Sequence, residues 1–398
     1  MAKPEIRLKG FEGDWEKFEL NQIFQERHVI STITPALPQL SFTIEEGVIK
    51  PENRKTNKRD FLIKDKTNKK YLVTFLNDII YNPANVIHGA IHKNNLCNGV
   101  VSPIYKIFYT NQNADFLDCI VRRKCFIKDV SKYMEGTVLK LRTLKPESFL
   151  KMSIYIGCIN EQKVIANYFK SLDSMLQSTT KKIEMLKQMK LASLVSMFPQ
   201  AGKTTPHVRF KGFEGEWEKE SAGHLFITFN ERNRPDLPIL SANQDIRGMT
   251  PRNDIGYQIS HDRLNEVTYK VVRPGQFVIH LRSFQGGFAH SSVEGITSPA
   301  YTVFGFKKSK EHDDYFWKII FMSKGFIKSL EAITYGIRDG KSISFTEFSE
   351  MKFLYPTKEE QQYIASYFRS LDKQISLKEQ KLEKLKQIKA ACLDKMFV

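Results

Sequence analysis

The chain has 398 residues, of which 41% are hydrophobic, 12% aromatic and 26% charged, with a formal net charge of +17. This composition excludes a disordered polyelectrolyte, and the lack of any run of about 18 apolar residues argues against a transmembrane helix. The surplus of Lys and Arg favours an anionic partner, either nucleic acid or an acidic membrane surface.

The first half opens on PEIRLKGFEGDWEK (4–17) and continues with short β-rich runs between polar loops. These runs predict strands at Tyr71–Phe75, Asp78–Tyr81 and Ile104–Tyr109, followed by a short helix at Phe116–Cys125. A segment without Gly or Pro, 161–198, then predicts a long helix that stops before Pro199.

The second half repeats this order. It opens on PHVRFKGFEGEWEK (206–219), which is identical to the first opening at ten of fourteen positions. Strands are expected at Lys270–Val272, Gln276–His280 and Ala300–Phe306, and a short helix at Asp314–Phe321. Residues 360–397 match 161–198 at nineteen of thirty-eight positions. The chain is therefore a tandem duplication.

We expect four segments from this repeat: a domain at 1–158, a helix at 159–199, a second domain at 200–357 and a second helix at 358–398. Apolar residues recur in both helices at a mean step near 3.5, which predicts a coiled-coil seam. Two such helices in one chain most simply pack on each other, although each could instead lie against its own domain. The predicted seam consists of Ile165, Phe169, Leu172, Leu176, Ile183, Leu186, Ile364, Phe368, Leu371, Ile375, Leu382 and Leu385.

Polar loops between the predicted strands offer groups that can read base edges, since Arg pairs with guanine and Asn or Gln with adenine. The two halves carry different residues in these loops, as two different recognition sequences would require. The candidate DNA-binding residues of the first half are Lys50, Asn53, Arg54, Lys55, Asn82, Asn85, His88 and His92. Those of the second half are Asn243, Gln244, Arg247, His280, Arg282, Ser283 and Gln285.

No catalytic constellation stands out. AGKT (201–204) lacks the upstream Gly of a phosphate-binding loop, and NPAN (82–85) lacks the aromatic residue of an adenine methyltransferase box. His88 and His92 are four residues apart but fall in a predicted loop, so no metal site is expected. Five cysteines without a C-x-x-C pair predict reduced thiols and a cytoplasmic protein, and the N-terminus has no apolar core of a secretory signal.

The repeated opening P-x-x-R-x-K-G-F-E-G-x-W and the helix start E-Q-x-x-I-A-x-Y-F-x-S-L-D resemble the specificity subunit of type I restriction-modification systems. The resemblance covers essentially the whole chain. One position departs from it: the family usually has Pro shortly before Glu-Gln, as Pro356 is here, whereas the first half has Gly157.

The resemblance implies an α+β fold: two mixed α/β target recognition domains separated by two long helices that form an antiparallel coiled coil. Each domain would read one half of a bipartite double-stranded DNA target, and the helices would act as a spacer. Two methyltransferase subunits and two restriction/translocase subunits would be the partners. S-adenosylmethionine, ATP and Mg²⁺ would belong to those partners, and this chain would carry no cofactor and no chemistry. The alternative is a stand-alone tandem-domain DNA-binding regulator.

Overall fold

The structure, a computed structural model, describes residues 2–54, 69–136, 142–243, 248–255, 263–280, 287–333 and 343–398. The chain divides into two compact units. The first unit contains Met1–Thr180 together with Gln380–Val398, and the second unit is the continuous stretch Lys181–Glu379. Each unit therefore includes parts of both predicted helices.

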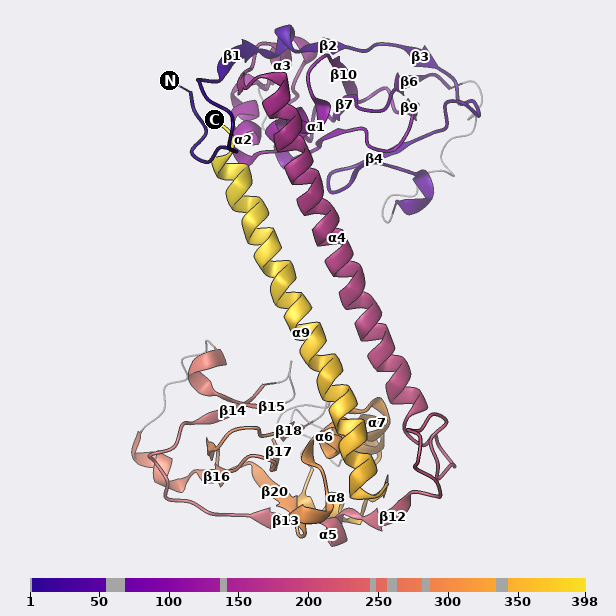
Figure 1. Ribbon diagram of the computed structural model, residues 1–398, viewed down its shortest axis with the longest axis vertical. Coiled ribbons are helices and arrows are strands. Elements are labelled where there is room, and N and C mark those ends of the chain that lie inside the picture. Colours follow the sequence, from indigo (N-terminus) through magenta and orange to yellow (C-terminus); the bar gives the residue numbers. More distant parts are fainter. Residues whose placement is uncertain are drawn as a thin grey trace. The chain divides into compact units, whose positions relative to one another are not determined.

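The first unit is built on short antiparallel sheets (Figure 1). Its four-stranded sheet has the order β2 (Phe24–Glu26), β10 (Lys106–Thr110), β7 (Ile79–Tyr81), β8 (Ile91–Lys93). A three-stranded sheet consists of β3 (Ile30–Ser31), β6 (Tyr71–Thr74) and β9 (Gly99–Val101). Two further pairs are the hairpin β4 (Ser41–Thr43) with β5 (Gly47–Ile49), and β1 (Glu16–Glu19) with β11 (Ser153–Ile156).

Three helices complete the core of the first unit: α1 (Ala114–Val121), α2 (Lys124–Tyr133) and α3 (Pro146–Leu150). The helix predicted at Phe116–Cys125 is two helices, because Arg123 takes an extended conformation and precedes α2. Phe108, Phe116 and Phe149 are fully buried in one apolar cluster with residues of both long helices.

The second unit repeats this plan with a larger sheet. Its six strands have the order β13 (Phe226–Phe229), β20 (Thr302–Phe306), β17 (Phe277–Ile279), β18 (Phe288–His290), β15 (Gly248–Pro251), β14 (Leu240–Asn243). Two pairs accompany it: β16 (Lys270–Val272) with β19 (Gly295–Thr297), and β12 (Glu218–Ser221) with β21 (Lys352–Tyr355). The helices are α5 (Ala222–Leu225), α6 (Asp314–Met322), α7 (Lys324–Ile333) and α8 (Phe345–Glu350).

The two long helices are α4 (Ile159–Ser196) and α9 (Lys358–Lys395), each of 38 residues. In the first unit the start of α4 meets the end of α9, where Tyr168 Oη lies 3.3 Å from Cys392 Sγ and Asp173 pairs with Lys389. The second unit repeats these contacts with the helices exchanged: Tyr367 Oη lies 2.9 Å from Ser193 Oγ, and Asp372 pairs with Lys190. The helices therefore pair in antiparallel fashion, and the predicted α+β class with paired long helices is confirmed.

The predicted seam residues lie on the buried faces of the two long helices, where several of them also pack in the apolar cores of the units. Most of them are buried, and the remaining three are partly buried. The buried ones are Ile165, Phe169, Leu172, Ile183, Ile364, Phe368, Leu371, Ile375 and Leu385, and the partly buried ones are Leu176, Leu186 and Leu382.

Candidate nucleic-acid interface

Each long helix begins with a buried Glu that binds the opening motif of its own half. Glu161 is 1% exposed, and its two oxygens accept hydrogen bonds of 2.7 Å from Nε and Nη2 of Arg7. Glu360, also 1% exposed, receives the same two bonds at 2.7 Å from Arg209. These bonds raise the pKa of both guanidinium groups. The repeated Arg and Glu of the sequence are therefore partners in both units.

The Gln that follows each Glu binds the adjacent elements. Gln162 accepts a hydrogen bond from the backbone N of Asn113, the N-cap of α1 (3.1 Å), and donates to the carbonyl of Gly157 (2.9 Å). Gln361 accepts from Asp313 N (3.0 Å), the N-cap of α6, and donates to the carbonyl of Pro356 (2.9 Å). We call each Arg–Glu–Gln set a junction clamp: Arg7–Glu161–Gln162 and Arg209–Glu360–Gln361.

The two junction clamps differ at the position where the sequence departs from the family pattern. A Cβ on Gly157 would lie 2.4 Å from Glu161 Oε2 and 2.8 Å from Trp15 Nε1. Because Gly has no Cβ, Trp15 donates a hydrogen bond to Glu161 at 3.1 Å. The second unit has Pro356 at this position, and the buried Nε1 of Trp217 has no hydrogen-bond partner.

The candidate residues at the β4–β5 hairpin lie just after its second strand. Lys50 and Asn53 are exposed. Arg54 is half-buried, and its Nε has no hydrogen-bond partner. Lys55 lies outside the described residues. The hairpin therefore presents two solvent-accessible polar groups in the described part of the chain.

A second group lies in the connection from β7 to β8. Asn85 and His88 are exposed, and Asn82 is half-buried with its Oδ1 accepting a hydrogen bond from Ala84 N at 3.0 Å. Gly89, with φ of +89°, ends the short turn that carries His88. This connection agrees with the polar loop expected from the sequence.

His92 does not lie in a loop, in contrast to the sequence expectation. It lies in β8, is 5% exposed, and its Nε2 is 2.6 Å from the carbonyl of Ile44 in the β4–β5 turn. The ring also packs on Phe42, 5.7 Å between centroids, and burial lowers the pKa of His92. The sequence reasoning failed here because Pro83 and Gly89, which precede this strand, favoured a loop.

Fewer of the candidates in the second unit can be placed. Asn243 ends β14 and is half-buried, and His280 directly follows β17, with its ring 6.0 Å from that of Tyr301. Gln244, Arg247, Arg282, Ser283 and Gln285 lie outside the described residues. The structure thus places the strands that carry these loops and not the loops themselves.

One basic residue beside the second hairpin was missed from the sequence. Arg252 follows β15, and its Nε donates to Ser241 Oγ on β14 at 3.3 Å. Its buried Nη1 has no hydrogen-bond partner. Its position follows from the register of the hairpin, which pairs Ser241 with Thr250. This register places Arg252 just past the end of β15.

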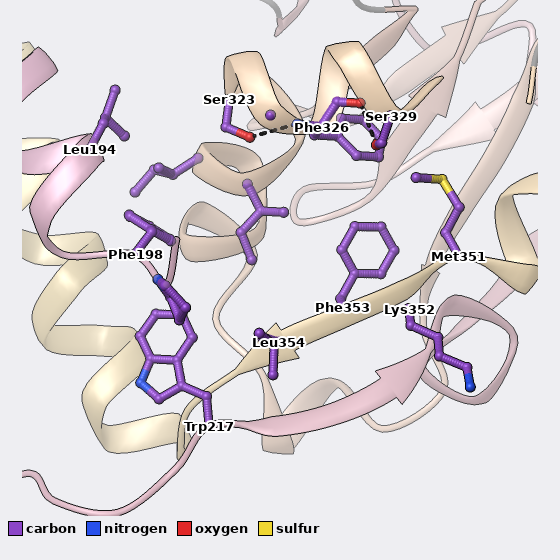
Figure 2. Close-up of a pocket in the computed structure, with 14 residues that line it drawn as sticks. Leu194, Phe198, Trp217, Ser323, Phe326, Ser329, Met351, Lys352, Phe353 and Leu354 are labelled. Atoms are coloured by element: carbon purple, nitrogen blue, oxygen red, sulfur yellow. Dashed lines mark hydrogen bonds between the residues drawn. The ribbon is translucent and has the colours of Figure 1, made fainter. Parts of the chain in front are cut away.

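The second unit also contains an apolar cavity of about 310 Å³ beside the end of α4 (Figure 2). Phe198, Phe326 and Phe353 face it, and Lys352 is the one charged residue of its lining. In the first unit Arg123, the counterpart of Ser323, lies over the ring of Phe397 at 5.3 Å. The corresponding Ser323 lines the cavity in the second unit, and the lining offers no acid–base pair.

Two searches of the described residues bear on other classes of site. In the described part of the chain, no group of three or more His, Cys, Asp or Glu could hold a metal ion. Among the helices described, none is both long enough and apolar enough to cross a membrane.

Comparisons with known proteins found a matching family and matching solved structures. Residues 217–387 match the family described as Type I restriction modification DNA specificity domain. The solved structure of a type I restriction-modification S subunit from M. genitalium is 13% identical with a TM-score of 0.60, and the match covers 100% of this chain and 99% of that one. An HsdS subunit from Thermoanaerobacter tengcongensis is 15% identical with a TM-score of 0.46, and the match covers 96% of each chain. No curated protein sequence matches.

Proposed function

We propose, from the match of residues 217–387 to the type I restriction modification DNA specificity domain family, that the whole chain reads a bipartite DNA target. Each unit would bind one half-site of double-stranded DNA. The observation that carries this proposal is the structural repeat: both units have the same junction clamp, formed with the same 2.7 Å hydrogen bonds. A specificity domain selects a sequence, and the chain is a non-catalytic subunit.

The surface chemistry supports DNA as the ligand. The net charge of +17 suits a polyanion, and exposed Lys50, Asn53 and Asn85 provide phosphate and base-edge donors in the first unit. The shared frame presents different residues at corresponding loops, which is what two unlike half-sites need. We assign Asn243, His280 and the candidate loop residues beside them to the second half-site.

Partner subunits would supply the chemistry. We propose that two methyltransferase subunits, one for each unit, transfer a methyl group from S-adenosylmethionine to adenine at the site that this chain selects. Two restriction/translocase subunits would use ATP and Mg²⁺. The complex would act in the cytoplasm, where its DNA substrate lies.

The decisive experiment is a genome-wide map of N6-methyladenine in cells that express this chain with its neighbouring methyltransferase. We expect a split motif of two short half-sites with a fixed unread gap. Cells that express the methyltransferase alone are the control and should lack this motif. If the motif is absent although the methyltransferase is active with another specificity subunit, the proposal is wrong and the stand-alone regulator becomes the better interpretation.

A further inference from the structure

Each of the two junction clamps buries a carboxylate, and burying a charged group costs free energy. Glu161 and Glu360 are each 1% exposed and each binds one Arg through two parallel hydrogen bonds. Burying an ion pair commonly gives no more stability than apolar residues of the same size would give. A bidentate Arg–carboxylate pair does, however, restrict the orientation of its partners strongly. The orientation that the pair imposes on its partners therefore needs an explanation, rather than its contribution to the stability of the protein.

Each clamp joins four segments of its unit at one point. The Arg comes from the opening motif, and its Nη1 also donates to a carbonyl of that motif at 2.5 Å, Gly13 in the first unit and Gly215 in the second. The Glu and Gln come from the first turn of the long helix. The Gln side chain then binds the N-cap of α1 or α6 and the residue that follows β11 or β21.

The contacts of the clamp bind the first turn of the long helix to the rest of the unit. The first turn of the helix is bound on several sides by hydrogen bonds, and these have stricter angular requirements than apolar packing. In the first unit Trp15 adds a further bond to Glu161. A helix held in this way cannot tilt at its base without breaking bonds whose groups are buried, which is costly.

We propose that the two junction clamps are positioning devices that hold each recognition unit at one angle on its helix and thereby set the number of unread base pairs that the protein accepts. This inference rests on the proposed function. The clamp residues do not touch DNA in this proposal; they act through the helix. Weakening a clamp should leave both half-sites unchanged and permit gaps one base pair shorter or longer than the normal one.

The test uses the full chain with its methyltransferase and the same methylation map. Glu161→Gln and Glu360→Gln each keep the side-chain shape and remove the charge. We expect methylation at altered gaps to rise roughly tenfold or more over the unmodified chain, as the loss of a charge-assisted hydrogen bond predicts. Half-site sequences should stay the same.

Asp78→Asn is the matched control. Asp78 is 2% exposed and binds Arg27 through two bonds of 2.8 and 3.1 Å, but this pair joins the ends of β2 and β7 and not the helix. It should reduce methylation, if at all, without new gap lengths. If the clamp variants only lower methylation at the normal gap and give no new gap lengths, the clamps are merely structural and the inference is overturned.

A milder variant decides the case in which Glu161→Gln does not fold. Arg7→Lys keeps the positive charge but cannot form the bidentate pair, so new gap lengths would support the proposal and their absence would overturn it. Failure of the proposed function is a different result, because the unmodified chain itself would then give no split motif.

Discussion

At the scale of single residues, the duplication provides an internal comparison. Gly157 and Pro356 occupy the same position before the two long helices, and the hydrogen bonds of Trp15 and Trp217 differ accordingly. The sequence showed that Gly157 replaces the expected Pro, but it did not show the effect on Trp15. That effect depends on the position of a Cβ at residue 157, which would lie 2.8 Å from Trp15 Nε1.

Gly157→Ala should destabilise the first unit. The new Cβ would approach Glu161 Oε2 to 2.4 Å and separate it from Trp15, leaving buried polar groups without good partners. We expect a loss of about 1–3 kcal/mol in the free energy of unfolding, measured by denaturant titration. The neighbouring Cys158→Ala, at an exposed side chain, should change little; equal losses for both variants would contradict the explanation.

Gly325→Ala should have the opposite effect in the second unit. Gly325 lies in α7 at the edge of the apolar cavity, and the nearest atom to its added Cβ is Ser323 Oγ at 4.0 Å. The substitution restricts the unfolded chain and should stabilise the protein by about 0.4–1 kcal/mol. Gly223→Ala, whose Cβ would lie 3.2 Å from a backbone oxygen of Ser349, should not stabilise. The melting temperatures of the two variants, each measured against the unmodified chain, test this difference.

His92 should make stability depend on pH. Burial lowers its pKa in the folded state, so the unfolded chain binds the proton more readily. Its contribution is therefore complete above the unfolded pKa of about 6.5 and is lost as the pH falls below that value. The melting temperature should fall between about pH 7.5 and about pH 5.5, and His92→Gln should show a smaller fall. Equal slopes would show that His92 is not responsible.

At the scale of elements, the two hairpins that carry candidate DNA-binding residues are attached differently. In the second unit β15 pairs with β18 in parallel, so the hairpin extends the main sheet. In the first unit the β4–β5 hairpin is a separate pair, and the His92–Ile44 hydrogen bond connects its turn to β8. The side chain of His92 thus links the hairpin to β8, whereas in the other copy backbone pairing between β15 and β18 provides this link.

His92→Leu should displace this hairpin and weaken recognition of one half-site. The substitution fills the site with an apolar side chain and removes the donor to the carbonyl of Ile44. We expect methylation of the full target by the complex to slow roughly tenfold, while His92→Gln, which retains a donor, should keep most of the rate. Unchanged rates for both variants would mean that the hairpin does not take part in recognition.

The sequence predicted the long helices and several strands and missed other strands, for a physical reason. A seam of six residues in each of two copies is a strong periodic signal, and every seam residue is buried or partly buried. The strands β6, β7, β10, β16, β17 and β20 lie where the apolar runs predicted them. The strands β8 and β18 directly follow Gly-containing segments that predicted loops. The pairing of β1 with β11 joins residues far apart in the chain and leaves no local pattern. Loop conformation likewise leaves no local pattern, so the sequence named candidate DNA-binding loops without their geometry.

At the scale of the whole molecule, the proposed spacer predicts a change in target. Each long helix has 38 residues, and deletion of one heptad from both, 182–188 and 381–387, shortens the pair by about 10 Å. At about 3.4 Å per base pair, the unread gap should shrink by about three base pairs with the half-sites retained. The methylation map of the variant measures the length of the unread gap directly. An unchanged gap would refute the spacer role.

The first unit is discontinuous in sequence, and this has a consequence for biosynthesis. Phe397 packs against Trp15, Phe116 and Phe169 in the core of the first unit. These three rings are translated before the second unit, whereas Phe397 is translated after it. The core of the first unit can therefore close only after the second unit, a continuous stretch, has been synthesised. Until then the incompletely buried rings are prone to aggregation.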